Sequence, residues 1–337
     1  MKTVETMNQL LDTISLSPKK PMVLATIIHV EGSAYRKEGA SILILRDKSR
    51  LGLLSAGCLE EDITERATEV FTTGNPSVVH FDMANEDDLA WGRGAGCNGR
   101  LTILLEPVND KLLSGLLFAK KALDSNKAVT RVVRFTPDMK LADGRFFPAE
   151  KSSTGSEVIK SSQLPTGLHP DAKNGGFLFV HQLKPRPRLF VFGAGDDAMP
   201  VVSLASQTGF DVTVIDWRPA FGSIERFPEA NMLLSDSLEK IFMGLSFSAA
   251  DLAVVMTHHF DRDQLILDSL LESGPLFYLG VLGPRERTER LLRGTPIPEF
   301  LHSPVGLAIG AQGPQEIAVS IVAEIIKKIR RDKEPAL

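Results

Sequence analysis

The sequence predicts an α/β protein with two domains, a mixed α+β N-terminal domain followed by a doubly wound parallel-sheet domain. Strand-like segments are grouped in the first half, which favours an α+β arrangement. From Leu189 onward, short apolar strands alternate with helical segments, as in βαβ units. Between the halves, the stretch Lys184-Pro-Arg-Pro-Arg188 has the composition of an exposed, semi-rigid connector. We therefore expect domains at residues 1–183 and 184–337.

The elements of the first half follow from the spacing of its apolar residues. Helical spacing predicts helices at 3–16, 59–71 and 111–123. Apolar runs rich in β-branched residues predict strands at 22–30, 41–46, 50–54, 78–81, 101–105, 128–135 and 176–182. The segment 137–175 is rich in Pro, Gly and Ser, so we expect a loop or a hairpin there.

The second half has the alternating rhythm of a parallel sheet. Strands are expected at 189–192, 212–215, 252–256 and 277–281. Helices are expected at 199–208, 263–272, 286–292 and 317–330. In such sheets ligands bind beyond the carboxyl ends of the strands, so the loops that follow the strands are the first place to look for a site.

Composition narrows the class of protein. The chain has 337 residues, of which 43% are hydrophobic and 24% charged, enough to build two packed cores. The net charge of −4 and the lack of a polybasic block argue against a nucleic-acid partner. No segment has the ~18 apolar residues that cross a membrane. With only two cysteines there is no disulfide framework, and a cytoplasmic location is expected.

A glycine loop between a strand and a helix is the strongest local motif. It reads Gly193-Ala-Gly195-Asp196-Asp197-Ala198, which resembles a dinucleotide fingerprint and makes the second domain Rossmann-like. Asp216 ends the next strand, where a carboxylate would bind a ribose hydroxyl. The alternative is that the loop is only a tight turn. Asp196 and Asp197 would repel a phosphate at the helix N-terminus, so binding of NAD(P) is possible but disfavoured.

Further polar and glycine residues follow the other predicted strands of this domain. His258, Arg285 and Arg287 are candidates to hold an anionic or phosphorylated ligand. His258 could instead cap a helix or serve as a structural hydrogen-bonding residue. The remaining candidates at these strand ends are Thr257, Gly280 and Gly283.

Three loops of the first domain combine glycine with polar residues, at 31–36, 55–60 and 91–99. Such glycine density is typical of backbone in special conformations or close to a ligand. The candidate cofactor-binding residues in these loops are Glu31, Ser33, Arg36, Gly57, Cys58, Glu60, Gly96 and Cys97.

Cys58 and Cys97 are also the candidate metal ligands, although the metal is unknown. They could form a shared ligand pair, a sulfur-handling pair, or two buried small hydrophobic residues. A structural zinc site is not expected because the sequence has no CxxC motif.

Taken together, these segments resemble the xanthine dehydrogenase accessory factor family of the XdhC/CoxI type, over roughly residues 10–330. The blocks that carry the resemblance in the first half are Ala25-Thr26, Glu31-Gly32-Ser33-Ala34 with Arg36, Gly57-Cys58-Leu59-Glu60, Trp91-Gly92 through Gly96-Cys97, and Leu104-Leu105-Glu106-Pro107. Those in the second half include Gly193-Ala-Gly195, Val214-Ile215-Asp216 with Arg218-Pro219, Arg226-Phe227-Pro228, Thr257-His258, Gly280-Val-Leu-Gly283 and His302-Ser303-Pro304.

The resemblance implies a non-catalytic factor that binds molybdenum cofactor (molybdopterin), supports its sulfuration and inserts it into an apo molybdenum hydroxylase. It further implies a cysteine desulfurase-type sulfur donor, a homodimer and a link to purine catabolism. The chain departs from the family pattern at Asp196, where the family usually has histidine, and at Ala308, where it usually has aspartate. Both changes are expected to touch the Rossmann-like crevice.

Two other functions remain open from the residues alone. One is an NAD(P)-dependent oxidoreductase that uses the loop at Gly193 together with Asp216. The other is a structural assembly partner with a vestigial crevice. An iron–sulfur subunit is excluded, because a [2Fe–2S] cluster takes four protein ligands and the chain has two cysteines.

Overall fold

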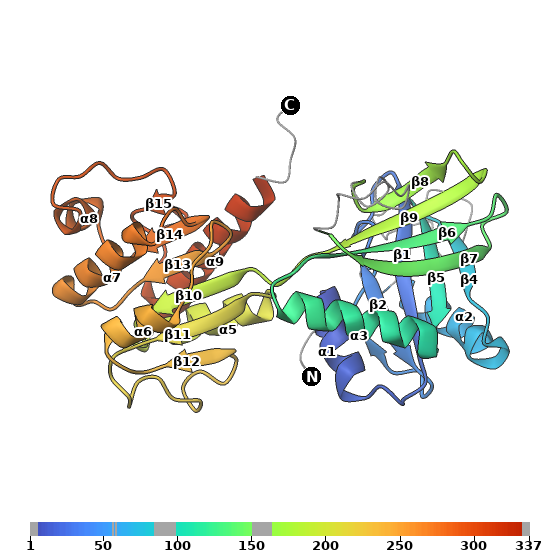
Figure 1. The fold of residues 1–337 in the computed structure, drawn as a ribbon, viewed down its shortest axis with the longest axis horizontal. Helices are drawn as coiled ribbons and strands as arrows, with labels where there is room; N and C mark the ends of the chain where they lie inside the picture. Colours follow the sequence, from blue (N-terminus) through green and yellow to red (C-terminus); the bar gives the residue numbers. More distant parts are fainter. Residues whose placement is uncertain (1–5, 56, 58, 84–98, 150–163, 332–337) are drawn as a thin grey trace. The chain divides into compact units, whose positions relative to one another are not determined.

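The computed structural model describes residues 6–55, 57, 59–83, 99–149 and 164–331. The chain forms two compact units, Met1–Pro185 and Arg186–Leu337 (Figure 1). In the described part of the chain, no helix combines the length and the apolar character that a membrane span requires.

The first unit contains two antiparallel sheets. The five-stranded sheet has the order β3-β2-β1-β5-β4. Its strands are β1 (Met22–Glu31), β2 (Ser41–Leu45), β3 (Arg50–Leu51), β4 (Ser77–Asp82) and β5 (Arg100–Pro107). The four-stranded sheet has the order β7-β6-β9-β8. Its strands are β6 (Val129–Phe135), β7 (Leu141–Pro148), β8 (Gly167–Asp171) and β9 (Gly176–Leu183).

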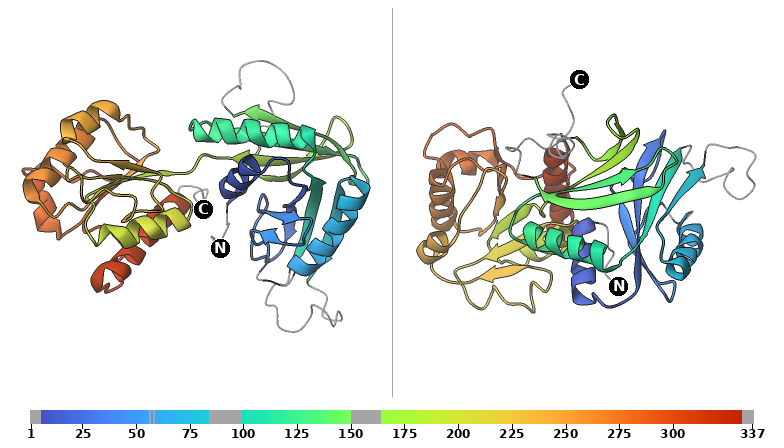
Figure 2. Two further views of the ribbon diagram at one scale, coloured as in Figure 1. Left: turned by 90° about the horizontal axis from the view of Figure 1, so that it is seen from below. Right: turned by 45° about the vertical axis from the view of Figure 1, so that its right-hand side comes forward.

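Helices cover both faces of the five-stranded sheet, because alternate residues of β1 are apolar on each face. Val23 and Ala25 pack against α2 (Glu60–Thr73). Met22 and Leu24 face the opposite way, towards α1 (Met7–Leu16) and α3 (Asp110–Asp124). The left view of Figure 2 shows α2 on one side of this sheet and α1 and α3 on the other. The two sheets meet through a smaller core that includes Ile28 and Phe179.

Local signals in the sequence fix the ends of these helices. Thr6 and Gln9 form a capping box at the start of α1. Asn109 caps α3 by accepting a hydrogen bond from Leu112 N. Gly74 ends α2 with a left-handed backbone, φ 70°, which glycine adopts without strain.

The second unit is a six-stranded parallel sheet with the order β12-β11-β10-β13-β14-β15. This is the doubly wound order in which the first strand lies at the centre of the sheet. The strands are β10 (Arg188–Phe192), β11 (Asp211–Ile215), β12 (Met232–Leu234), β13 (Leu252–Val255), β14 (Tyr278–Val281) and β15 (Leu301–His302). Successive strands are added on one side of β10 as far as β12 and on the other side from β13 onward. The crevice is therefore expected between β10 and β13.

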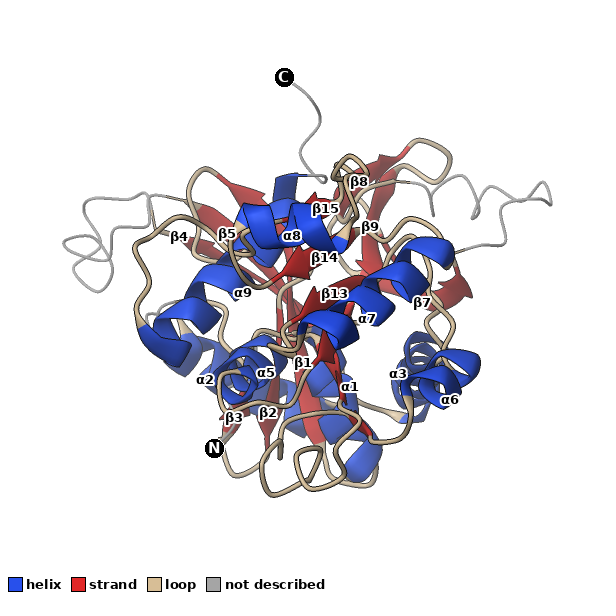
Figure 3. Ribbon diagram, turned by 90° about the vertical axis from the view of Figure 1, so that its left-hand side faces the viewer, coloured by secondary structure: helices blue, strands red, loops and turns tan. Residues whose placement is uncertain are grey.

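Helices lie on both faces of the parallel sheet (Figure 3). Leu189 and Val191 of β10 face α5 (Ala198–Gln207) and α9 (Gly313–Arg331). Phe190 and Phe192 face the other side, where three further helices pack. These are α6 (Leu238–Gly244), α7 (Phe260–Glu272) and α8 (Arg285–Leu291).

The predicted fold class is confirmed, and the differences lie in short elements. Of the two interpretations of the segment 137–175, a loop or a hairpin, the described residues support the hairpin. β7 pairs with β6, and β8 pairs with β9. Three short elements, β12, α6 and β15, were not predicted from the sequence.

Candidate functional site

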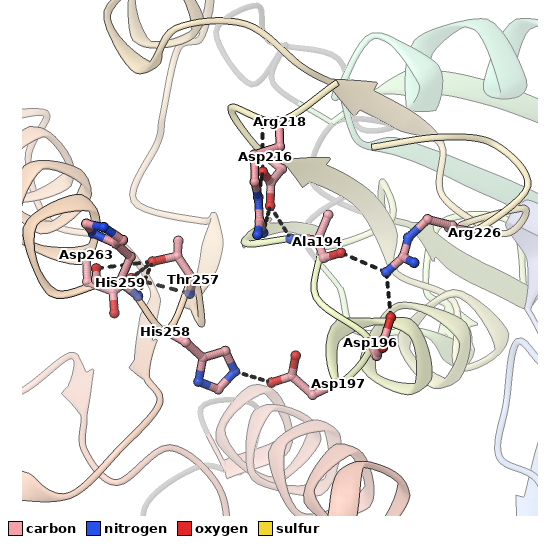
Figure 4. Close-up of polar contacts among 10 residues, drawn as sticks. All are labelled: Ala194, Asp196, Asp197, Asp216, Arg218, Arg226, Thr257, His258, His259 and Asp263. Atoms are coloured by element: carbon pink, nitrogen blue, oxygen red, sulfur yellow. Dashed lines mark hydrogen bonds and ion pairs between the residues drawn. The ribbon is translucent and has the colours of Figure 1, made fainter. Parts of the chain in front are cut away.

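The candidate site of the second unit lies at the carboxyl ends of β10, β11 and β13 (Figure 4). The loop 193–197 follows β10, and the loop 256–259 follows β13. Because β10 and β13 are neighbours with crossovers on opposite faces, these loops border the crevice where ligands bind in doubly wound folds.

Gly193 is required by the packing of the crevice floor. Its φ is +111°, and a Cβ atom there would lie 2.6 Å from the carbonyl oxygen of Met256. Its N–H donates to Ile215 O at 2.8 Å. Glycine at this position therefore lets the turn after β10 lie against the end of β13, whether or not a phosphate binds there. Gly195, the second glycine, has no positive φ, and a Cβ there would meet the Asp197 carboxylate at 2.6 Å.

Asp216 lies at the end of β11, as predicted, but its carboxylate is fully engaged. Oδ2 accepts from Ala194 N at 2.8 Å, and Oδ1 accepts from Arg218 N at 2.9 Å. Arg218 also donates from Nε and Nη2 to the two oxygens, at 2.9 and 2.8 Å. Burial alone would raise the pKa of Asp216, but these hydrogen bonds outweigh it and lower the pKa. A ribose hydroxyl would have to displace Arg218 to reach this carboxylate.

The two aspartates of the glycine loop have basic partners. Asp196 accepts from Arg226 Nη2 at 2.9 Å, and Asp197 is hydrogen bonded to His258 Nε2 at 2.7 Å. The repulsion of a phosphate by these two carboxylates stays a prediction. The structure adds the partners that the sequence did not pair with them, Arg226 beside Asp196 and His258 beside Asp197. Ala308, the other departure from the family pattern, is exposed in the loop between β15 and α9.

His258 has a left-handed backbone, φ 59°, which is uncommon for a residue with a side chain. The conformation directs the ring across the crevice to Asp197 (Figure 4). His258 makes no helix cap, because the cap of α7 is His259, which has no side-chain capping hydrogen bond. The ring is 60% exposed, so His258 is accessible to a ligand.

Thr257 and Arg287 belong to a buried network centred on Asp263. Asp263 Oδ1 accepts from Thr257 Oγ1 at 2.5 Å, and its Oδ2 accepts from Arg287 Nη2 at 2.6 Å. The network ties the end of β13 to α7 and α8. Thr257 therefore shapes the loop that carries His258, and the guanidinium of Arg287 is held by Asp263.

The other predicted residues of this domain serve the packing or the surface. A Cβ on Gly280 would lie 2.4 Å from Val305 Cγ2, so glycine in β14 makes room for that side chain. Gly283 forms the turn into α8 with φ +115°. Arg285 is exposed and pairs with Glu289 within α8 at 3.1 Å.

A set of stacked cations and aromatic rings at the end of β11 was not predicted. The guanidinium of Arg218 lies 4.6 Å from the ring centre of Trp217 and 3.8 Å from that of Phe221. Arg226 lies 5.2 Å from the same Phe221 ring, and Arg262 lies 5.2 Å from Trp217. Two of these arginines were visible in the blocks Arg218-Pro219 and Arg226-Phe227-Pro228, but nothing in their spacing pointed to the glycine loop.

Arg226 makes direct contact with the glycine loop. Besides Asp196, its Nη2 donates to Ala194 O at 3.1 Å. Its Nε is buried and has no hydrogen-bond partner among the described residues. Arg226 thus brings a positive charge to the loop that precedes α5, where a phosphate binds in folds of this kind.

In the first unit, Glu60 organises the loop 55–60 rather than facing outward. Its carboxylate is buried and accepts from Leu54 N at 3.0 Å and Ser55 N at 2.8 Å. Ser55 Oγ also donates to it at 2.5 Å and accepts from Leu59 N at 2.9 Å. Gly57 is exposed with φ +105° and open space around its Cα. Glu60 therefore ties Leu54 and Ser55 to the start of α2.

The loop 31–36 meets the end of the third glycine loop. A Cβ on Gly99 would lie 2.4 Å from Ser33 O and 2.7 Å from Glu31 O, so glycine permits this contact. Glu31 is exposed and pairs with Arg100 at 3.6 Å. Arg36 is partly buried in the same loop.

Three predicted residues, Cys58, Gly96 and Cys97, lie outside the described residues. Within the described ranges, no cluster of three or more His, Cys, Asp or Glu side chains is arranged to hold a metal ion.

Comparison with known families gives two matches along the chain. Residues 189–325 match the family described as the XdhC Rossmann domain. Residues 15–82 match the family described as XdhC and CoxI.

Three relatives match over most of their length. A probable xanthine dehydrogenase subunit of Bacillus subtilis (strain 168) is 41% identical over 94% of this chain and 96% of its own. "Molybdenum cofactor insertion chaperone PaoD" of Escherichia coli (strain K12) is 25% identical over 92% of this chain and 84% of its own. A crystal structure titled as a xanthine dehydrogenase from Bacillus halodurans superposes with a TM-score of 0.87, at 41% identity, covering 97% of this chain and 96% of that one.

Proposed function

The chain belongs to the XdhC and CoxI family, and from this premise we propose that it is an accessory factor for a molybdenum hydroxylase of the xanthine dehydrogenase type. In this proposal it binds molybdenum cofactor and helps to insert it into the apo enzyme. The Escherichia coli relative, which is named a molybdenum cofactor insertion chaperone, supports this role. The name of the Bacillus subtilis relative links the family to xanthine dehydrogenase.

The observation that carries the proposal is the charge arrangement at the glycine loop. The carboxylate that would recognise a ribose is held by Arg218, whereas Arg226 and His258 lie beside the loop. Such a crevice suits a phosphate whose remaining part is not a nucleoside. Molybdopterin carries a phosphate on a pterin, so the residues fit this cofactor. Arg226 and the backbone of the loop would hold the phosphate, and His258 would contact the ligand from the side of β13.

In this proposal, the first unit supplies the residues that handle the sulfur of the cofactor. The cofactor of these hydroxylases supplies a molybdenum centre that carries a terminal sulfur when active. In the proposal, Cys58 or Cys97 handles this sulfur, which a cysteine desulfurase-type donor provides. The buried Glu60 holds Ser55, which precedes Cys58 in the chain, by accepting a hydrogen bond from its N–H. We further propose that the chain acts as a homodimer.

The nicotinamide alternative has less support. A dinucleotide-dependent oxidoreductase would use Asp216 to bind a ribose hydroxyl, but Arg218 already donates to both oxygens of that carboxylate.

An anaerobic titration of the full chain with molybdenum cofactor tests the proposal. Bound cofactor would be measured by the fluorescence of the oxidised pterin. We expect saturable binding that weakens about tenfold in Arg226→Ala, since a hydrogen bond from a charged donor is worth about 1.5–3 kcal/mol. Arg293→Ala is the matched control, because Arg293 pairs with Asp268 at 2.9 Å in the same unit but does not contact the crevice residues. No saturable binding by the wild type would overturn the proposal.

A further inference from the structure

A charged cavity lies wholly within the first unit, where helix α3 begins beside β5, β6 and β7. Its volume is about 140 Å³, which is room for several water molecules or one small ion. Polar residues that line it include Glu106, Asn109, Lys111 and Arg131, and the ring of Phe146 forms part of its wall. None of these residues belongs to the crevice described above.

Arg131 is the buried cation of this cavity. It is 1% exposed, and its Nη2 donates to Glu106 Oε1 and Oε2 at 2.6 and 2.5 Å. Its Nε and Nη1 are also buried, and neither has a hydrogen-bond partner among the described residues. Buried guanidinium donors without an acceptor are rare in folded proteins and call for a ligand or ordered water. Glu106 thus satisfies only one of the three nitrogens of Arg131.

The N-terminus of α3 lies beside the same cavity, since Asn109, Lys111 and Leu112 line it. Asn109 accepts two hydrogen bonds from this turn. Leu112 N donates to its Oδ1 at 3.0 Å, and Leu113 N donates to its backbone carbonyl oxygen at 2.8 Å. The N–H groups of Asp110 and Lys111, in the first turn, have no acceptor within the helix. The positive end of the helix dipole adds to the charge of Arg131, against the negative charges of Glu106 and of Asp110 in the first turn.

Lys111 lies at the mouth of the cavity, with its side chain 72% exposed. Its Nζ is 2.8 Å from Asp143 Oδ1, and Asp143 also pairs with Arg145 at 2.7 Å. Lys111 can therefore turn towards a ligand without leaving Asp143 unpaired.

We propose that this cavity binds a small oxyanion of the phosphate class, either inorganic phosphate or the phosphate group of a small ester. The ligand accepts hydrogen bonds from the free donors of Arg131 and from the first turn of α3, while Lys111 closes the mouth. The inference does not depend on the proposed function of the second unit.

Calorimetric titration of the full chain tests the proposal, with inorganic phosphate and glycerol 3-phosphate as separate probes and potassium chloride at matched ionic strength as the blank. We expect a saturable site that is retained in Arg226→Ala, because that variant removes the cation of the crevice in the second unit and leaves this cavity unchanged. Lys111→Ala should weaken binding about threefold, in the range of an exposed ion pair, and Lys111→Glu should weaken it about tenfold. Binding of inorganic phosphate alone identifies a free ion as the ligand, whereas tighter binding of the ester identifies a phosphorylated metabolite.

The double variant Arg131→Met with Glu106→Leu removes both buried charges and so leaves neither unpaired. It should lose the saturable site while it keeps the far-UV circular dichroism of the wild type. If the double variant does not fold, the two Lys111 variants still test whether phosphate binds in this cavity. Lys240→Ala is the matched control, because Lys240 is similarly exposed and pairs with Asp236 at 3.2 Å in the other unit. Absence of saturable binding in the wild type, or equal binding by all variants, would overturn the proposal and leave Arg131 and Glu106 as a structural cross-link.

Discussion

Arg218 holds the carboxylate of Asp216 through two side-chain hydrogen bonds, from Nε to Oδ1 at 2.9 Å and from Nη2 to Oδ2 at 2.8 Å. The pair lies at the end of β11, where a dinucleotide-binding protein presents a free carboxylate to a ribose. The same guanidinium stacks on Phe221, which holds it in this position. The crevice therefore keeps the form of a nucleotide-binding site while its ribose-recognition residue is engaged within the protein.

Asp216→Asn should destabilise the second unit without weakening the binding of NADH. The change removes a charge-assisted interaction of a buried group, which costs about 1–3 kcal/mol. Since the pKa of Asp216 is lowered by folding, its stabilising effect is present at neutral pH and lost as the pH falls below 3.8. Because asparagine does not titrate, the free energy of unfolding of the variant should also fall less than that of the wild type as the pH drops below 3.8. Urea unfolding and calorimetry with NADH measure both effects, and a loss of NADH affinity would show that Asp216 does meet a ribose.

Asp196→Asn should strengthen the binding of a phosphate-bearing ligand by about two- to fivefold. The side chain of Asp196 is 87% exposed, so its repulsion and its pairing with Arg226 are both screened by water. The gain should shrink as salt is raised. Titration with molybdopterin at low and high salt measures it, with Asp236→Asn as a control for an exposed aspartate that pairs with Lys240. A gain that does not depend on salt would contradict an electrostatic origin.

Replacement of Cys58 or Cys97 by serine should reduce activation of the client enzyme and leave folding intact. Serine keeps the size of the side chain but is a poor nucleophile and metal ligand beside a thiolate. Client activity after incubation with each variant and a sulfur donor measures the effect, and circular dichroism controls for folding. Full activation by the double variant would assign both cysteines to the packing of the domain.

The stability of the first unit should fall as the pH is lowered from 7 to 5. His181 of β9 is buried, and burial, followed by the charge of Arg131, lowers its pKa from 6.5 to about 3. The unfolded chain therefore binds a proton that the folded chain excludes, which costs about 2 kcal/mol between pH 6.5 and pH 5. Urea unfolding at the two pH values should show this loss in the wild type and in the control His169→Gln, but not in His181→Gln. An equal loss in His181→Gln would assign the pH dependence to other groups.

The periodicity of the apolar residues was sufficient to predict the long helices and strands, the α+β character of the first unit and the parallel sheet of the second. It missed β12 and β15 because strands of three and two residues have no period to detect. Strand β8 was hidden by Pro170, since proline argues against a strand. The structure accommodates this proline because β8 is at the edge of its sheet.

The positions of the crevice loops were also predictable, but the pairings within them were not. Asp216 was identified by its distance from Gly193, whereas its capture by Arg218 depends on how a two-residue loop folds back. Arg226 reaches Asp196 across 30 residues of chain, and His258 reaches Asp197 across 61. Such contacts follow from the tertiary fold and have no signature in local spacing.

Transfer of the cofactor to an enzyme is the most direct test of the account. The full chain would be loaded anaerobically with molybdenum cofactor, freed of excess ligand, and mixed with an apo molybdenum hydroxylase of the xanthine dehydrogenase type. Xanthine oxidation would then be followed with an electron acceptor. We predict that the loaded chain activates the apo enzyme faster than an equal amount of free cofactor, and that the loaded chain alone oxidises no xanthine. Turnover by the loaded chain alone, or activation no faster than with free cofactor, would contradict the account.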